Sequence, residues 1–198
     1  MDKRGYFENL APRWDGLPET PGAAAGTRRF VERLALDEVR WIADVGCGTG
    51  ILVPHLARAF PDARIIEIDF ALSMVRESLR KHAATQLSGI CGDAAQLPLV
   101  PGSCDALLCF GVLPHLGDPS LLLPELLRPL RRGGTLAVGH TMASHELNAF
   151  HAGLGGLVES DRLLPATELA ARLREAGAAS IVAEEHPGWY FVRAVAGC

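Results

Sequence analysis

The sequence contains no apolar stretch long enough to cross a membrane. Its longest apolar run covers residues 106–113, whereas a transmembrane helix needs about 20 apolar residues. The opening residues 1–4 are also not followed by the apolar core of a secretory signal. We therefore expect no membrane span and no export signal, and we interpret residues 106–113 as a buried strand.

A large excess of charge of one sign is missing too. The chain has 23 acidic and 19 basic residues, for a formal net charge of -4. A stripe of lysine and arginine, which is typical of proteins that bind nucleic acid or anionic membranes, does not stand out. The charge pattern therefore predicts no nucleic-acid partner.

Cys-x-x-Cys pairs, which would indicate a redox or metal-binding motif, are absent as well. The five cysteines fall mostly on predicted strands: Cys47, Cys91, Cys104, Cys109 and Cys198. An odd number of unpaired cysteines is typical of reduced thiols inside a cell, so we expect a cytoplasmic protein.

The chain does contain enough apolar sequence for one folded domain over residues 1–198, because 48% of it is hydrophobic and 21% is charged. From Trp41 onward, strand and helix patterns alternate. The predicted strands are 41–45, 64–68, 86–91, 105–110, 134–139, 180–184 and 189–195, and the predicted helices between and after them are 50–60, 72–82, 119–130 and 167–176. Short connections between alternating elements favour an α/β fold with a doubly wound, seven-stranded, mostly parallel sheet.

Residues 1–40 precede this alternation and form a predicted helical cap. Four apolar side chains recur there at roughly helical intervals: Tyr6, Phe7, Leu10 and Trp14. The face that they form either packs onto the domain or acts as a lid that keeps water from a ligand. A second, amphipathic helix is predicted over residues 27–39.

The motif around which the chain is organised is the glycine-rich turn at residues 44–50, Asp-Val-Gly-Cys-Gly-Thr-Gly. It joins the first predicted strand to a helix, as in a nucleotide-binding unit. Glycine permits positive φ and a close ligand, and the start of the helix offers free N–H groups. The spacing is Gly-x-Gly-x-Gly, with Ile51 where a dinucleotide-binding motif has its third glycine. Taken alone, the turn could be purely structural.

Acidic residues follow the next two predicted strands. Asp69 ends the second strand, and Asp93 follows the third. In doubly wound sheets, ligands bind beyond the carboxyl ends of the strands. A carboxylate accepts two hydroxyl hydrogen bonds at once, so Asp69 suits a ribose diol, while Asp93 suits an exocyclic amine.

Together, these motifs resemble those of the class I S-adenosylmethionine-dependent methyltransferases, in particular the small-molecule branch that includes the ubiquinone/menaquinone C-methyltransferases. The matching stretches are residues 6–7, 11–15, 44–50, 68–69 with Met74, 92–94 and 113–115. The resemblance implies a Rossmann-like fold with an antiparallel last strand. It also implies methyl transfer from S-adenosylmethionine to a small-molecule acceptor by in-line displacement, with S-adenosylhomocysteine as product.

The resemblance divides the chain after the cap into three parts. Residues 41–142 would bind the cofactor, 143–165 would be a substrate-side insertion, and 166–198 would hold the last helix and two strands. The implied cofactor-binding residues are Asp44, Gly46, Cys47, Gly48, Asp69, Phe70, Met74, Asp93, Ala94 and Cys109. Among them, Gly46, Gly48 and Cys109 would contact the methionine moiety with Asp44 in support, Asp69 would hold the ribose, and Met74, Asp93 and Ala94 would contact the adenine. The chain departs from the family at residues 70–72, where a polar helix cap is usual.

Histidines supply the candidate catalytic residues His115, His145 and His151. Drawn as a helix, residues 145–151 place His145, Asn148 and His151 on one face, which predicts either substrate contact or a solvated surface. This segment, with Asp161 and Pro165, is similar to a pattern in one branch of the family. Zinc held by His140, His145 and His151 is disfavoured, because the spacing is not His-Glu-x-x-His, and we expect no metal.

Two further functions stay open at this point. One is a module that binds S-adenosylmethionine without catalysis and acts through a partner. The other is a nicotinamide-dependent oxidoreductase, which Ile51 and Asp93 disfavour. If the chain is a methyltransferase, the apolar side chains of Tyr6, Phe7 and Trp14 favour a hydrophobic or aromatic acceptor.

Overall fold

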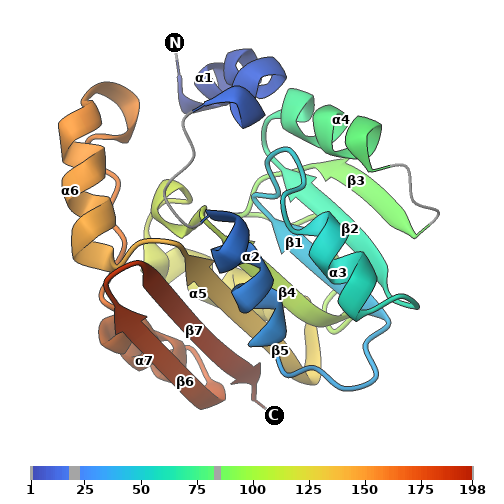
Figure 1. Ribbon diagram of the computed structural model, residues 1–198. Coiled ribbons are helices and arrows are strands. Elements are labelled where there is room, and N and C mark those ends of the chain that lie inside the picture. The colour runs from blue at the N-terminus through green and yellow to red at the C-terminus, as the bar shows by residue number, and fades with distance from the viewer. Residues whose placement is uncertain (1, 18–22, 83–85, 198) are drawn as a thin grey trace.

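The computed structural model describes residues 2–17, 23–82 and 86–197 and contains a seven-stranded sheet (Figure 1). The strands are β1 (Trp41–Val45), β2 (Arg64–Asp69), β3 (Leu87–Cys91), β4 (Cys104–Phe110), β5 (Leu130–His140), β6 (Ala178–His186) and β7 (Trp189–Ala196). Their order is β3-β2-β1-β4-β5-β7-β6. Strands β1 to β5 pair in parallel, whereas β7 is antiparallel to both β5 and β6. The predicted doubly wound sheet with an antiparallel last strand is thus confirmed.

Helices cover both faces of the sheet (Figure 1). They are α1 (Lys3–Leu10), α2 (Ala23–Glu32), α3 (Val53–Ala59), α4 (Leu72–Lys81), α5 (Pro119–Leu127), α6 (Ser144–Leu154) and α7 (Ala166–Glu175), with short 3₁₀ helices at Ala11–Gly16, Leu113–His115 and Gly156–Val158. One core joins α2 and α3 to the sheet through side chains such as Phe30 and Leu56. The other joins α5 and α7 to the opposite face through Leu126 and Leu173. No helix within the described residues is long and apolar enough to span a membrane.

The predicted helix over residues 27–39 is wrong in its bounds, because α2 ends at Glu32. Ala35 and Glu38 have φ values of 48° and 46°, and this left-handed backbone cannot continue a right-handed helix. The helix predicted over residues 50–60 likewise starts later, at Val53. In both cases the apolar spacing continues past residues with positive φ, which for the second helix is Gly50 with φ 83°.

The unusual residues 70–72 do precede a helix, but its cap comes from elsewhere in the chain. Helix α4 has no side-chain cap of its own. Instead, the carboxylate of Glu8 in α1 accepts hydrogen bonds from the backbone N–H of Leu72 (2.6 Å) and of Ser73 (2.9 Å). The hydrogen bond with Ser73 lowers the pKa of Glu8 below its ordinary value. Since free N–H groups at a helix start favour a carboxylate, Glu8 holds α1 beside α4, as Figure 1 shows.

We expect Glu8→Ala to lower the free energy of unfolding by about 1 kcal/mol, because the first turn of α4 loses its acceptor. Urea denaturation followed by circular dichroism measures this. The matched control is Glu77→Ala in α4, which removes only a surface ion pair with Arg80 and should change little. Equal losses in the two variants would contradict the capping role.

Candidate functional site

The glycine-rich turn after β1 is fixed to the end of β2. The backbone N–H groups of Gly46 and Cys47 both donate to the carbonyl of Ile68, at 2.7 and 3.1 Å. Gly46 has φ +72°, and a Cβ there would lie 2.1 Å from Val112, so glycine is required at this position. Gly48 has φ +54°, and no atom lies within 4 Å of where its Cβ would be. The turn therefore leaves open space beside Gly48.

Asp69, at the end of β2, lies next to this open space. Its Oδ2 accepts from the N–H of Gly48 (3.0 Å) and its Oδ1 from the N–H of Ala71 (2.9 Å). The residue is 7% exposed, and each oxygen keeps capacity for a further hydrogen bond. Burial raises the pKa of Asp69, against the opposing effect of the two N–H donors.

The carboxyl groups of Asp44 and Glu67 lie below the turn, and Glu67 was not predicted as a site residue. Asp44 and Glu67 are register partners on β1 and β2, so their side chains lie on the same face of the sheet. They are 2% and 0% exposed. Burial raises the pKa of Asp44 well above its ordinary value and that of Glu67 to about 7. The signal available in the sequence was that Glu67 stands between Ile66 and Ile68 in the middle of the strand, where a charged residue is unusual.

Glu67 has one satisfied and one unsatisfied oxygen. Its Oε2 accepts from Ser78 Oγ at 2.9 Å, whereas its Oε1 is buried without a partner among the described residues. A buried, unpaired carboxylate oxygen is costly, and burial accordingly raises the pKa of Glu67 to about 7.

The remaining predicted cofactor-binding residues differ in their exposure, since Asp93 is exposed whereas Ala94 and Met74 are buried. Asp93 is exposed and follows β3; one of its oxygens accepts from the N–H of Ala95 (2.9 Å), and the other is free among the described residues. Ala94 is 6% exposed. Met74 is buried in a small cluster, against which the half-buried Phe70 packs.

Cys109 corrects a prediction. It is 0% exposed and belongs to the core between the sheet and helices α5 and α7, so it cannot contact a ligand at the strand ends. Burial raises the pKa of its thiol above the ordinary value. Cys47 is 4% exposed, and its Sγ donates to the carbonyl of Gly48 at 3.5 Å.

Two of the predicted catalytic histidines come together around Asp161. His115 Nδ1 lies 2.6 Å from Asp161 Oδ2, and His151 Nδ1 lies 3.2 Å from the backbone carbonyl of Asp161. The ring centroids of His115 and His151 are 5.0 Å apart. The other carboxylate oxygen of Asp161 accepts from Lys3 Nζ at 2.6 Å. Lys3 was not predicted, because a surface lysine in α1 gives no signal of this distant contact.

His140, at the end of β5, joins this group. Burial, with smaller effects from His115 and His151, lowers its pKa to about 4. We call His115, His140 and His151 the histidine cluster. It lies beyond β4 and β5, which are neighbours in the sheet.

His145 is not part of the cluster. Its side chain is exposed and lies near the carboxylates of Glu146 and Glu185. Asn148 does not line an open face either, because its amide bonds both the N–H and the carbonyl of Leu163. Within residues 2–17, 23–82 and 86–197, no three histidine, cysteine or acidic side chains are grouped so that they could hold a metal ion.

The first helix and the 3₁₀ helix after it extend over both parts of the site. The ring of Phe7 lies 5.8 Å from that of Phe70, beside Asp69, and 5.8 Å from that of His115. Asp15 accepts from Thr49 Oγ1 of the glycine-rich turn at 2.6 Å and pairs with Lys81 of α4. Residues 3–16 are thus tied to the turn, to α4 and to Asp161.

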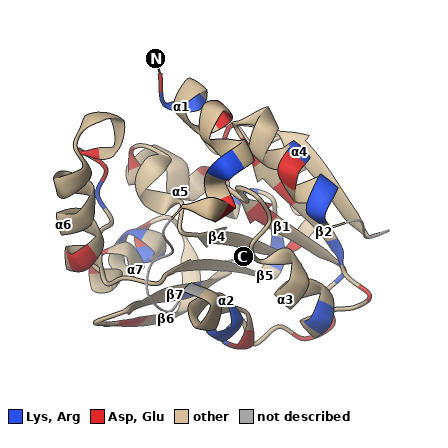
Figure 2. Cartoon of the chain, turned by 45° about the horizontal axis from the view of Figure 1, so that its top comes forward, with Lys and Arg blue, Asp and Glu red and all other residues tan. Residues whose placement is uncertain are grey.

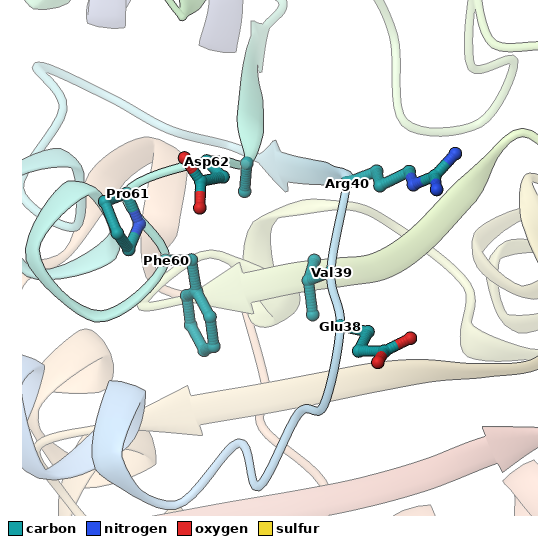
Figure 3. A pocket seen from close by; sticks show the side chains of 7 residues that line it. Glu38, Val39, Arg40, Phe60, Pro61 and Asp62 are labelled. Atoms are coloured by element: carbon teal, nitrogen blue, oxygen red, sulfur yellow. The ribbon is translucent and has the colours of Figure 1, made fainter.

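A surface cavity of about 460 Å³ lies elsewhere, lined by residues 38–40 and 60–63 (Figure 3). These residues precede β1 and β2, so the cavity is at the opposite edge of the sheet from the strand ends described above. Figure 2 shows both acidic and basic residues on helices α1, α2 and α4.

Comparison with known proteins identifies the family. Residues 43–138 match the family model described as a methyltransferase domain. The chain is 32% identical over 159 residues to malonyl-[acyl-carrier protein] O-methyltransferase of Herminiimonas arsenicoxydans, covering 80% of this chain and 58% of that protein. It is 30% identical over 184 residues to trans-aconitate 2-methyltransferase of Azoarcus sp. (strain BH72), covering 91% and 66%.

The chain carries a class I S-adenosylmethionine-dependent methyltransferase domain. Its fold agrees with that of the phosphoethanolamine N-methyltransferase 2 of Haemonchus contortus, solved with phosphomonomethylethanolamine and S-adenosylhomocysteine. The TM-score is 0.77 at 14% identity, over 99% of this chain and 58% of that one. The methyltransferase domain thus spans only 58% to 66% of the length of the two curated relatives.

The residues at the strand ends of this domain fit S-adenosylmethionine. The open space beside Gly48 admits a ligand against the backbone. Asp69 retains accepting capacity for ribose hydroxyls, and Asp93 has a free oxygen that could accept from an amine. These features require no rearrangement of the turn.

We expect Asp69→Ala to weaken binding of S-adenosylmethionine by at least about tenfold, because hydrogen bonds from two hydroxyls to a charged group are lost. Isothermal titration calorimetry measures the affinity. Asp62→Ala, in the cavity of Figure 3, is the matched control and should bind normally. Because Asp69 also holds the glycine-rich turn through Gly48, thermal denaturation of both variants checks that each is still folded. Near-normal affinity in a folded Asp69→Ala variant would contradict the assignment.

The buried Glu67 predicts how stability depends on pH. Its pKa is raised on folding, so the native state binds more protons than the unfolded state between the ordinary value of 4.5 and about 7, and stability falls as pH rises through that window. Glu67→Gln removes the cost of ionisation. It should therefore stabilise the domain more at a pH above 7 than near pH 5, as measured by urea denaturation at both. An equal effect at the two pH values would count against this account.

Proposed function

We propose that this methyltransferase transfers a methyl group from S-adenosylmethionine to a small-molecule acceptor by in-line displacement. The observation that carries the proposal is the position of two sets of groups at one edge of the sheet. Gly48, Asp69 and Asp93 are the candidate cofactor residues, and the histidine cluster with Asp161 lies beyond the adjacent strands.

The cofactor supplies an activated methyl group on a cationic sulfur, so the chain has mainly to position the reactants and exclude water. Asp69 would hold the ribose, and Asp93 with the backbone of Ala94 would hold the adenine. Asp44, below the turn, would support the methionine moiety through the glycines. Correct orientation alone can contribute roughly 7–11 kcal/mol of the barrier in such reactions.

Residues 1–40 would act as the cap over this site, with residues 3–16 as a lid. The support lies in three contacts from these residues to separate parts of the rim: Glu8 to α4, Asp15 to Thr49, and Lys3 to Asp161. A ring such as Phe7, between Phe70 and His115, excludes water and favours a hydrophobic or aromatic acceptor.

The names of two relatives support a small-molecule acceptor, since these relatives are methyltransferases of malonyl-[acyl-carrier protein] and of trans-aconitate. A third relative is a ubiquinone/menaquinone biosynthesis C-methyltransferase. The cytoplasmic location expected from the cysteines stays a prediction.

The test is release of S-adenosylhomocysteine from S-adenosylmethionine on addition of small-molecule acceptors, followed by mass spectrometry. We expect product with at least one acceptor class. We also expect His151→Ala to bind S-adenosylmethionine normally and to turn over more slowly, because His151 lies on the acceptor side. Binding of the cofactor without transfer to any acceptor would instead support a non-catalytic binding module.

A further inference from the structure

The three rings of the histidine cluster have defined hydrogen-bonding roles. Asp161 carries a carboxylate, which only accepts hydrogen bonds, so His115 donates to it from Nδ1–H. His151 likewise donates from Nδ1–H to the carbonyl of Asp161. In its neutral form, each of these two rings therefore presents a bare Nε2 that accepts a hydrogen bond.

His140 has the opposite arrangement. The backbone N–H of Met142 donates to His140 Nδ1 at 3.1 Å, so this nitrogen carries no proton. The neutral ring, which burial favours by lowering the pKa to about 4, then has its proton on Nε2. His140 is thus a hydrogen-bond donor beside two acceptors.

The Nε2 atoms of the cluster are free to meet a ligand. None of the three has a hydrogen-bond partner among the described residues, and none is a fully buried, unpaired atom. Each of them therefore keeps some contact with solvent. A ligand that satisfies the cluster has to donate a hydrogen bond to His115 or His151 and accept one from His140.

We infer that the methyl acceptor presents an acidic hydroxyl group next to a carbonyl group, as in an enolised dicarbonyl or a phenol with an ortho carbonyl. This inference rests on the proposed methyl transfer. The carbonyl oxygen accepts from His140 Nε2–H, and the hydroxyl donates to His115 Nε2. Asp161 is a positioning residue, because it fixes the orientation and the protonated nitrogen of His115.

The reaction balances with these groups alone. The O–H bond of the acceptor breaks, and its proton goes to Nε2 of His115. The oxygen electron pair forms the new O–CH₃ bond as the S–CH₃ bond breaks, and that bonding pair stays on sulfur. The imidazolium of His115 is stabilised by Asp161, and it returns its proton to solvent after the product leaves.

The charges around His115 determine its pH behaviour. Burial lowers its pKa, whereas Asp161 acts in the opposite direction, and His151 and Lys3 lower it further; His140 is the remaining titratable group of the cluster. Removal of the Asp161 charge should therefore shift the acidic limb of the pH–rate profile to lower pH.

The test compares ortho-hydroxyacetophenone with its para isomer, which separates the hydroxyl from the carbonyl. We expect the ortho isomer to be methylated at least about tenfold faster. Asp161→Asn should lower kcat for the ortho isomer by at least about tenfold, leave the affinity for S-adenosylmethionine unchanged and move the acidic limb. Lys3→Met breaks the same lid contact but keeps the His115–Asp161 pair, and it should not move that limb to lower pH, because the Lys3 charge itself lowers the pKa of His115.

Equal rates for the isomers, or no methylation of the ortho isomer, would overturn the inference. The inference would also be overturned if the acidic limb of the pH–rate profile lay at the same pH in Asp161→Asn as in Lys3→Met. Binding of S-adenosylmethionine and transfer to any other acceptor would still support the proposed function, so the two failures are distinguishable.

Discussion

The carboxylate of Asp69 bonds both the N–H of Gly48 and the N–H of Ala71, and this pair of hydrogen bonds sets the shape of the cofactor edge. Through them, the turn after β1 and the segment leading into α4 are held by one side chain at the end of β2. Gly46 can pack against Val112 only because it lacks a Cβ, which brings the end of β4 to the same place. The glycine-rich turn, Asp69 and the approach to the acceptor side are therefore parts of one arrangement.

The N-terminal helices complete that arrangement from outside the sheet. Helix α4 lacks a capping side chain, and Glu8 supplies one from α1. Asp161 connects the lid to the histidine cluster, because it contacts Lys3 and His115 with its two carboxylate oxygens. In the proposed function, closing of the lid and orientation of the base would thus be linked by the side chain of Asp161.

Much of this could be predicted from the sequence, for physical reasons. Alternating strands and helices with short connections are compatible with few sheet topologies, and this predicted the parallel sheet. The parallel sheet in turn predicted that Asp69 and Asp93 lie at the ends of neighbouring strands. The glycine-rich turn was recognisable because a turn with positive φ values requires glycine at defined positions. Cys109 was misplaced because the spacing did not show which face of β4 each residue occupies.

The contacts that the sequence could not show are those between distant segments. Glu8 and Lys3 lie on a polar helix surface, and only the docked position of α1 gives them partners. His145 and His151 share a helix, yet only His151 reaches Asp161, because the residues from Asp161 to Leu163 run along one side of α6. Glu67 is conspicuous by its charge, but its neighbours Asp44 and Ser78 come from separate elements.

A crystal structure with S-adenosylhomocysteine would test the central claim most directly. The account predicts that the ribose hydroxyls bond Asp69, that the adenine lies beside Asp93, and that the sulfur faces the histidine cluster. A nucleoside bound away from Asp69, or a sulfur atom directed away from His115 and His140, would contradict it.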